Sequence, residues 1–308
     1  MKGILLVNMG SPSSQIEMRK FLYNMFSDFA IIPLPEFTRK TVAFIISRTR
    51  FKKSWQKYEK IGGSPMKNSS KIIEENLQNE LGEKFLVYTC SSYLSPNIKE
   101  GIEYLKNIGA TEIKVIPMYP HSSFSTTESI KTEIKKNKNL YENISVKITG
   151  EFYKNKYFIL FWKNLIEETI KKNNLNKPIL LFSAHSIPKY QVMFGDTYVL
   201  EIEESSRFIA DSTGLEYKVS YQSKMGKMKW AEPDTKSVLA ELAKKKHEDI
   251  IIVPISFISE NLETLYDLDF DIIPYAKNEL KIKNIYRVKI PNSHPLLVQT
   301  LKDIIISN

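Results

Sequence analysis

Three carboxylates, Glu263, Asp267 and Asp271, follow one another at intervals of four residues in one acidic segment. The segment, residues 257–271, comes after the apolar run at residues 250–255. Read as a helix, it would carry the three carboxylates along one face, because side chains four residues apart stack on each other. Like charges at this spacing destabilise a helix, so a bound divalent cation would compensate them. The alternative is an ordinary solvated helix face, which the spacing alone does not exclude.

A histidine is the second residue whose side chain could take part in a reaction. His185 lies in Ser-Ala-His-Ser-Ile-Pro, just past a predicted strand, and the chain has only four histidines. Imidazole has a pKa of ~6.5 in water, so a histidine accepts protons at neutral pH without special tuning. One imidazole beside carboxylates makes a nitrogen and oxygen donor set, which suits Fe²⁺ or a similar ion better than structural zinc. A histidine that only makes structural hydrogen bonds is the alternative.

Charge is distributed unevenly along a basic protein. Residues 247–276 hold seven Asp or Glu and no Lys or Arg, whereas the 308-residue chain has a net charge of +9. Residues 38–57 hold seven Lys or Arg and no acid, interleaved with apolar side chains such as Phe44 and Trp55. Such a segment suits an anionic bilayer surface or the mouth of a site for an amphipathic anion. A surface helix that packs its apolar face on the core explains it equally well.

Composition excludes several classes of protein. With 42% apolar and 26% charged residues the chain is an ordinary globular one. Its single cysteine, Cys90, excludes an intrachain disulfide and fits a reducing, cytoplasmic setting. No signal peptide is expected, since the apolar run within residues 1–8 is too short for one, and no apolar run reaches ~18 residues. Neither a nucleic-acid-binding signature, nor a dinucleotide-binding Gly motif, nor a P-loop is present, so no nucleic acid partner is expected.

Short apolar runs alternate with helix-length amphipathic stretches, which predicts an α/β fold with parallel sheets flanked by helices. Residues 4–12 resemble residues 179–188, and 113–118 resemble 250–255, so two similar doubly wound, Rossmann-like lobes are expected. We predict an N-terminal lobe at 1–150 and a C-terminal lobe at 151–308, with the last helix crossing back. Ligand-side loops would then gather in a cleft between them. The predicted strands are 3–9, 85–90, 112–118, 145–148, 178–182, 217–221, 249–254 and 284–288; the predicted helices are 15–26, 69–81, 97–108, 157–172, 200–212, 236–246 and 295–305.

Six motifs, taken in order, resemble those of the ferrochelatases, the lyases that insert Fe²⁺ into a porphyrin in heme biosynthesis. The resemblance covers nearly the whole chain, and the motifs together are far more specific than any one of them. They are Leu6-Val-Asn-Met-Gly-Ser-Pro12, Tyr58-Glu-Lys-Ile-Gly-Gly-Ser-Pro65, Met118-Tyr-Pro-His-Ser-Ser-Phe-Ser-Thr-Thr127, Phe182-Ser-Ala-His-Ser-Ile-Pro188, Tyr221-Gln-Ser-Lys-Met-Gly226 with Lys229-Trp-Ala-Glu-Pro233, and residues 259–269.

The resemblance implies roles for individual residues. His185 and Glu263 would be the catalytic pair and the metal ligands, and Asp267 and Asp271 would extend a path for metal or protons. Residues 37–50 would form an apolar lip at the pocket mouth, which in animal-type relatives also faces the membrane. The implied substrate-binding residues are Met9, Tyr58, Ser64, Tyr119 and Trp230.

The implied activity is insertion of Fe²⁺ into protoporphyrin IX, with release of two protons. Gln222, Trp230 and Met9 favour this substrate over coproporphyrin III. Fe²⁺ is a substrate, no cofactor is required, and no iron–sulfur cluster is expected because the sequence ends at Asn308 without the cysteine-bearing extension. The alternatives are a coproporphyrin III ferrochelatase, a chelatase for another tetrapyrrole or for cobalt, and a non-enzymatic two-lobe binding protein. The expected location is the cytoplasm, with peripheral contact at the inner face of the membrane.

Three positions depart from the family pattern. Asn261 stands where many relatives have histidine, so a role for that second imidazole does not carry over. His121 replaces a glutamine common in relatives, and Ser92 replaces an arginine.

Overall fold

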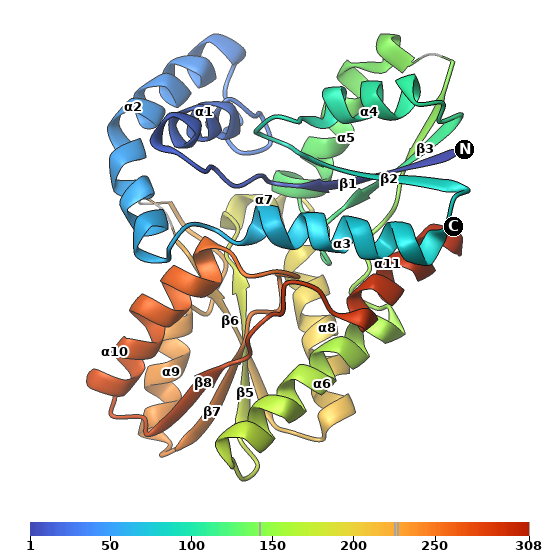
Figure 1. Ribbon diagram of the computed structural model, residues 1–308. Helices are drawn as coiled ribbons and strands as arrows, with labels where there is room; N and C mark the ends of the chain where they lie inside the picture. Colours follow the sequence, from blue (N-terminus) through green and yellow to red (C-terminus); the bar gives the residue numbers. More distant parts are fainter. Residues whose placement is uncertain (142, 225, 227, 308) are drawn as a thin grey trace. The chain divides into compact units, whose positions relative to one another are not determined.

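The computed structural model describes residues 1–141, 143–224, 226 and 228–307, and the chain divides into two compact units (Figure 1). Unit 1 consists of Met1–Glu151 and Leu301–Asn308, and unit 2 of Phe152–Thr300. The cleft expected between the two halves stays a prediction. None of the helices in the described ranges has both the length and the apolar character needed to cross a bilayer.

Unit 1 is built on a parallel sheet in which the described residues form four strands, in the order β2-β1-β3-β4. On the central strand β1, Leu5 and Val7 point to the same face and join a buried apolar cluster there. A strand that is covered on both faces is apolar at successive positions, which explains the run Ile4-Leu-Leu-Val7. The strands are β1 (Lys2–Asn8), β2 (Phe85–Ser91), β3 (Glu112–Pro117) and β4 (Ser145–Ile148).

Helices of unit 1 complete the apolar cluster. Ile98 and Ile102 of α4 and Ile130 of α5 pack on the sheet face that bears Leu5 and Val7. The bounds are α1 (Gln15–Phe26), α2 (Glu36–Lys60), α3 (Met66–Leu81), α4 (Ile98–Asn107), the π-helical η1 (Phe124–Glu128), α5 (Ser129–Lys136) and the 3₁₀ turn η2 (Lys138–Tyr141).

Unit 2 repeats this plan. Its described residues form a second four-stranded parallel sheet, in the order β6-β5-β7-β8. Figure 1 shows α6 and α8 on one side of this sheet and α9 and α10 on the other. The elements are α6 (Lys156–Asn173), β5 (Ile179–His185), α7 (Lys189–Met193), α8 (Tyr198–Thr213), β6 (Tyr217–Gln222), α9 (Thr235–Lys244), β7 (Asp249–Val253), the π-helical η3 (Glu263–Ile272), α10 (Ile273–Asn278) and β8 (Asn284–Arg287).

The C-terminal helix α11 (Pro295–Ile306) begins in unit 2, and its last residues belong to unit 1. Within unit 1, Lys302 pairs with Glu80 of α3 at 2.8 Å. The Lys114 Nζ donates to the carbonyl oxygen of Ile305 at 2.6 Å. At the start of the helix, the Nδ1 of His294 accepts from the backbone N–H of Leu296 at 3.1 Å and so caps the first turn.

The predicted fold class, two similar α/β lobes with parallel sheets, is confirmed, and two details differ. Strand β5 extends to His185, whereas the sequence predicts an end at Phe182. The extension follows β6, since the register pairs His185 with Gln222 after β7 has ended at Val253. The acidic segment 257–271, considered above as a helix, is helical only in its second part, where η3 begins at Glu263 and is π-helical.

The two units also match in an uncommon feature. A π-helical segment follows the third strand of each sheet, η1 after β3 and η3 after β7. A π-helix closes i→i+5 hydrogen bonds, is rare, and is often found at functional sites. Because a π-helix occurs at equivalent points of both units, we expect the functional site among the loops at the carboxyl ends of the strands.

Candidate functional site

His185 is the last residue of the central strand β5 and is half-buried. Its neighbour Ser186 donates a backbone hydrogen bond to Gln222 on the β6 side, so the backbone N–H of His185 points to the β7 side. Strand β7 has already ended there, and a buried N–H needs an acceptor. The hydroxyl of Ser256, in the loop after β7, accepts it at 3.0 Å.

The side chain of His185 is held by the same loop. The rings of His185 and Phe257 meet edge to face, with centroids 6.5 Å apart and planes at 86°. Tyr198 is buried beside Ser256: burial raises the pKa of Tyr198, and a hydrogen bond with Ser256 lowers it in part. The end of β5 and the loop after β7 therefore form one packed assembly, which positions the imidazole.

The three acidic residues follow Phe257 in the same segment, and all of them lie on η3. Glu263 and Asp267 are half-buried and Asp271 is exposed. Because η3 is π-helical, four residues span slightly less than one turn, whereas in an α-helix they span slightly more, so the spacing still keeps the three carboxylates near one face of the helix.

Asp267 and Asp271 have partners within unit 2. The Ser223 hydroxyl, in the loop after β6, donates to Asp267 Oδ2 at 2.7 Å. Lys236 of α9 pairs with Asp271 at 2.8 Å. A lysine thus compensates part of the like-charge repulsion for which the sequence suggested a cation.

The beginning of η3 is fixed by its own polar residues. The Oδ1 of Asn261 accepts from the backbone N–H of Thr264, and the Oγ1 of Thr264 accepts from the backbone N–H of Asn261, both at 3.0 Å. Asn261 is buried. At the position where relatives carry histidine, this chain therefore has a helix cap, and an asparagine oxygen suits that role.

Sequence reasoning missed Arg287, the last residue of β8. Its buried guanidinium contacts Asp269 through two nitrogens, at 2.8 and 2.7 Å, and Glu260 through a third, at 2.8 Å. Burial alone would lower the pKa of Arg287, but its bonds to Asp269 and Glu260 raise it. Nothing in the sequence around Arg287 marks it as a functional residue. The one indication is that residues 247–276 contain seven acids and no basic residue to pair with them.

Trp230 is half-buried and lies beside the end of β5, because it forms an isolated backbone bridge with Pro188. The next residue, Ala231, donates to the carbonyl oxygen of Ile187 at 2.8 Å. Met225, in the motif Tyr221–Gly226, lies outside the described residues. Trp230 thus lies at the His185 edge of the sheet, and its role in substrate binding stays a prediction.

The four remaining substrate-binding predictions fall in unit 1. Met9 follows the end of β1 and is half-buried, and its carbonyl oxygen accepts from Tyr93 N–H at 3.3 Å. Tyr119 follows β3 and packs against the apolar cluster. Tyr58 is buried in α2 and stacks on Trp55, and the Ser64 hydroxyl accepts from Met66 N–H at the start of α3. Met9 and Tyr119 share the carboxyl edge of one sheet, whereas Tyr58 lies near the end of α2 and Ser64 lies in the α2–α3 connection.

His121 is buried in the loop between β3 and η1, with 2% of its surface exposed. Desolvation lowers the pKa of His121 to about 3. The side chain is therefore neutral at physiological pH and does not act as a proton acceptor there.

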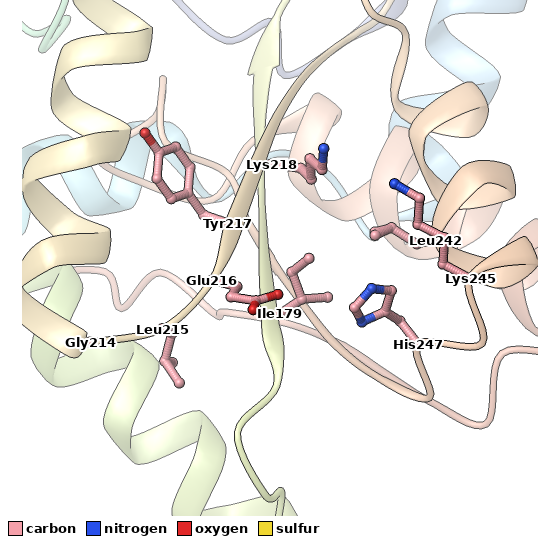
Figure 2. A pocket seen from close by; sticks show the side chains of 9 residues that line it. All are labelled: Ile179, Gly214, Leu215, Glu216, Tyr217, Lys218, Leu242, Lys245 and His247. Atoms are coloured by element: carbon pink, nitrogen blue, oxygen red, sulfur yellow. The ribbon is translucent and has the colours of Figure 1, made fainter.

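Two depressions lie away from these loops. One of about 620 Å³ is at the amino ends of β5 and β6, the edge of unit 2 opposite His185 (Figure 2). Ligands of parallel sheets bind at the carboxyl ends, so we do not assign the site there. Its lining is Ile179, Gly214, Leu215, Glu216, Tyr217, Lys218, Leu242, Lys245 and His247.

The other depression, of about 490 Å³, lies between α1 and α2 of unit 1 and combines apolar and basic side chains. Phe37 is 86% exposed on α2, and Ile45 is exposed as well. The guanidinium of Arg48 lies 4.0 Å from the centroid of the Phe44 ring. The apolar face of α2 is therefore not all packed on the core, contrary to the simplest reading of residues 38–57. The lining is Gln15, Ile16, Arg19, Lys20, Tyr23, Phe44, Ser47 and Phe51.

In the part of the chain that the structure describes, no three His, Cys, Asp or Glu side chains form a preassembled metal site. The candidate site consists of the imidazole of His185 at the end of β5 and the half-buried carboxylates of Glu263 and Asp267 on η3, which follows the adjacent strand β7. It is able to exchange protons and to offer oxygen ligands, whereas it has none of the thiolates of a storage site.

Comparison with known proteins gives the family. The ferrochelatase family model matches residues 1–308. The ferrochelatase of Aquifex aeolicus (strain VF5) is 36% identical over 308 residues, covering 99% of this chain and 98% of that protein. That of Sulfurihydrogenibium sp. (strain YO3AOP1) is 34% identical over 330 residues, with 99% and 98% covered. That of Rickettsia bellii (strain OSU 85-389) is 36% identical over 311 residues, with 98% and 86% covered.

Solved structures support the fold alone. SirB from Bacillus subtilis, determined with Fe³⁺, matches with a TM-score of 0.62 at 14% identity, over 99% of this chain and 96% of that one. The sirohydrochlorin chelatase SirB of Bacillus subtilis subspecies spizizenii, in complex with cobalt, gives 0.61 at 12% identity, over 98% and 94%. The whole-chain match and the identities above 30% show that this chain belongs to the ferrochelatase family, the lyases that insert a metal ion into a tetrapyrrole.

Proposed function

We propose that the protein inserts Fe²⁺ into protoporphyrin IX and releases the two inner pyrrole protons. The observation that carries this proposal is the placement of His185 at the end of the central strand β5, fixed by Ser256 and Phe257 of the loop that leads to Glu263. A chelatase needs a proton acceptor and a metal-accepting carboxylate, and both occur on neighbouring elements of unit 2.

His185 takes up the pyrrole protons. A porphyrin has two inner N–H groups, and both protons must leave before four nitrogens bind the metal. A well-placed base contributes ~10²–10⁴-fold to the rate. With Asn261 committed to capping η3 and His121 buried and neutral, His185 is the imidazole that we assign to this step.

Glu263 either receives Fe²⁺ or passes protons outward. Asp267 and Asp271 continue from Glu263 toward the exposed end of η3, where Lys236 accompanies Asp271. Carboxylates bind Fe²⁺ less tightly than thiolates do, which suits transfer to the porphyrin. Both routes use the same residues, so substitution of Glu263 tests them together.

The proposed porphyrin-binding residues are Trp230 in unit 2 and Met9, Tyr58, Ser64 and Tyr119 in unit 1. In a planar porphyrin the inner nitrogen lone pairs point toward the centre of the ring, so the protein must bend the ring when it binds. Bending costs ~1–5 kcal/mol, which contacts with the ring periphery offset. Aromatic and thioether side chains provide such contacts without adding charge. Trp230 and Met9 are half-buried, so part of each side chain is exposed and could contact a ligand, which supports this proposal.

Protoporphyrin IX is the proposed tetrapyrrole, since Gln222, Trp230 and Met9 match the protoporphyrin pattern. The test is an anaerobic absorbance assay with Fe²⁺ and protoporphyrin IX, run in parallel with coproporphyrin III, and with sirohydrochlorin because SirB is a sirohydrochlorin chelatase. We expect the highest kcat/KM for protoporphyrin IX. A preference for coproporphyrin III would reverse the substrate assignment, and porphyrin binding without turnover would contradict the enzymatic role.

We further propose that α2 meets an anionic membrane surface from the cytoplasmic side. Exposed Phe37 and Ile45 would enter the interface, while Arg48 and Arg50 would pair with lipid headgroups. No resident cofactor is proposed, and Fe²⁺ enters as a substrate.

A further inference from the structure

We propose that Arg287 is a positioning residue of the metal-insertion site: by binding both Glu260 and Asp269 it fixes η3 and so orients Glu263 and Asp267. The inference rests on the proposed function of these two carboxylates. Arg287 itself ends β8, the edge strand of the unit 2 sheet, and lies outside every motif of the family resemblance.

The contacts of the guanidinium are nearly complete. Arg287 donates through Nε to Asp269 Oδ1 at 2.8 Å and through Nη2 to Asp269 Oδ2 at 2.7 Å, a bidentate pair. Its Nη1 donates to Glu260 Oε1 at 2.8 Å and to the carbonyl oxygen of Val288 at 3.1 Å. A planar fork matches a carboxylate in this way, and a lysine ammonium does not.

Burial makes these contacts decisive. The Arg287 side chain is 2% exposed, that of Glu260 is 12% exposed and that of Asp269 is 32% exposed. A charge buried to this degree requires partners, and removal of one partner leaves the others uncompensated. The three groups therefore keep one arrangement instead of exchanging partners with solvent.

The two carboxylates that Arg287 binds bracket the functional ones. Glu260 precedes η3, and it also accepts from the backbone N–H of Ile290 at 2.9 Å and from the Thr264 hydroxyl in the first turn. Asp269 lies within η3, after both Glu263 and Asp267. With the helix held before and after these positions, neither its rotation nor its axial position is free.

Side chains on other faces of η3 show what this fixation achieves. Leu268 and Ile272 enter the apolar cluster against the sheet. Asp267 reaches Ser223 on the loop after β6, while Asp269 reaches Arg287 on β8. The acids of the segment are thus divided: Glu260 and Asp269 bind Arg287, whereas Glu263, Asp267 and Asp271 belong to the candidate site.

The test compares Asp269→Asn and Arg287→Lys with Asn284→Ala. Asn284 begins β8 and donates to Asp249 Oδ1 at 2.7 Å, so its loss weakens the same strand at its far end.

We expect Asp269→Asn to accelerate amide hydrogen exchange in residues 263–272 by ~10-fold or more, with little change elsewhere in unit 2. We expect kcat to fall ~10–100-fold with an unchanged KM for porphyrin, since small displacements of reacting groups have effects of this size. Asn284→Ala should change neither quantity at equal or greater loss of stability.

A double-mutant cycle with Glu263→Gln identifies the route of the effect. If Arg287 acts through Glu263, Asp269→Asn lowers kcat much less in the Glu263→Gln background than in the wild type. Equal effects in both backgrounds, unchanged exchange in 263–272, or faster exchange with unchanged kcat would each overturn the inference. A wild-type protein without chelatase activity would instead contradict the proposed function, and the exchange measurement would still report on the Arg287 contacts.

Discussion

The hydroxyl of Ser223 donates a hydrogen bond to Asp267 across 2.7 Å, from the loop after β6 to the π-helix after β7. Ser223 has a left-handed backbone conformation, with φ of 65°, which is unusual for a residue other than glycine. The bond connects two ligand-side loops of one sheet and restrains one of the three acids in the proposed path. Loss of the bond should therefore affect metal transfer without affecting the fold.

For Ser223→Ala we expect a fall in kcat of less than tenfold, with normal porphyrin binding. The variant removes one hydrogen bond to a charged group, worth ~1.5–3 kcal/mol at most, and leaves Asp267 itself in place. Steady-state rates at varied Fe²⁺ check this, with Ser212→Ala as a control on the outer part of α8. An effect as large as that of Glu263→Gln would mean that Ser223 has a direct role.

For His185→Ala we expect iron insertion to be abolished, a loss of at least ~10²–10⁴-fold, while porphyrin still binds. Turnover follows from absorbance, and binding from porphyrin fluorescence. His247→Ala is the matched control, because His247 lies in the depression at the opposite edge of the same unit. Normal turnover by His185→Ala would remove the assignment of His185 as the proton acceptor.

For Glu263→Gln we expect a severe loss of rate with a nearly isosteric side chain, because an amide neither carries the negative charge nor relays protons. The measurement is the dependence of rate on Fe²⁺ concentration. Glu216→Gln, at the opposite edge of the sheet, controls for loss of a carboxylate in unit 2. Unchanged Fe²⁺ kinetics in Glu263→Gln would argue against both the metal-binding and the proton-relay role.

For His121→Gln we expect a change in the pH dependence of stability. Desolvation lowers the pKa of His121 to about 3, so the unfolded chain binds a proton below pH ~6.5 that the folded protein rejects until about pH 3. This linkage removes stability as pH falls, by ~2 kcal/mol between pH 7.5 and 5. Urea unfolding at the two pH values should show a smaller acid loss in His121→Gln than in the wild type. An equal loss in both proteins would show that His121 is protonated in the fold.

For Arg48→Glu combined with Arg50→Glu we expect weaker binding to vesicles that contain anionic lipid. Each basic residue near such a surface contributes ~1 kcal/mol, so reversal of two charges should lower partitioning more than tenfold. Co-sedimentation with and without phosphatidylserine measures it. Lys84→Glu with Lys147→Glu gives the same change in net charge elsewhere on unit 1. Binding that does not depend on anionic lipid would contradict the membrane proposal.

Local patterns determined much of this protein in advance. The apolar runs predicted strands at all eight positions where the described residues form them, because a strand covered on both faces needs successive apolar residues. The likeness of Ile4–Val7 to the run beginning at Ile179 predicted two lobes of one plan. The end of β5 was predicted three residues early, since whether pairing continues to His185 depends on the length of β6, a separate part of the chain.

The sequence by itself determined the α/β class, the family and the residue types available for chemistry, since these follow from hydrophobic patterning and from motifs within short stretches. Only the tertiary structure decided that η3 is π-helical, that Asn261 caps it, and that acids of one segment have different partners. Asp267 bonds to Ser223, Asp271 to Lys236 and Asp269 to Arg287, over separations of 44, 35 and 18 residues. The physical reason is that the spacing of charges along a chain specifies which groups are close on one helix, whereas their partners come from strands and loops that only the folded sheet brings beside it.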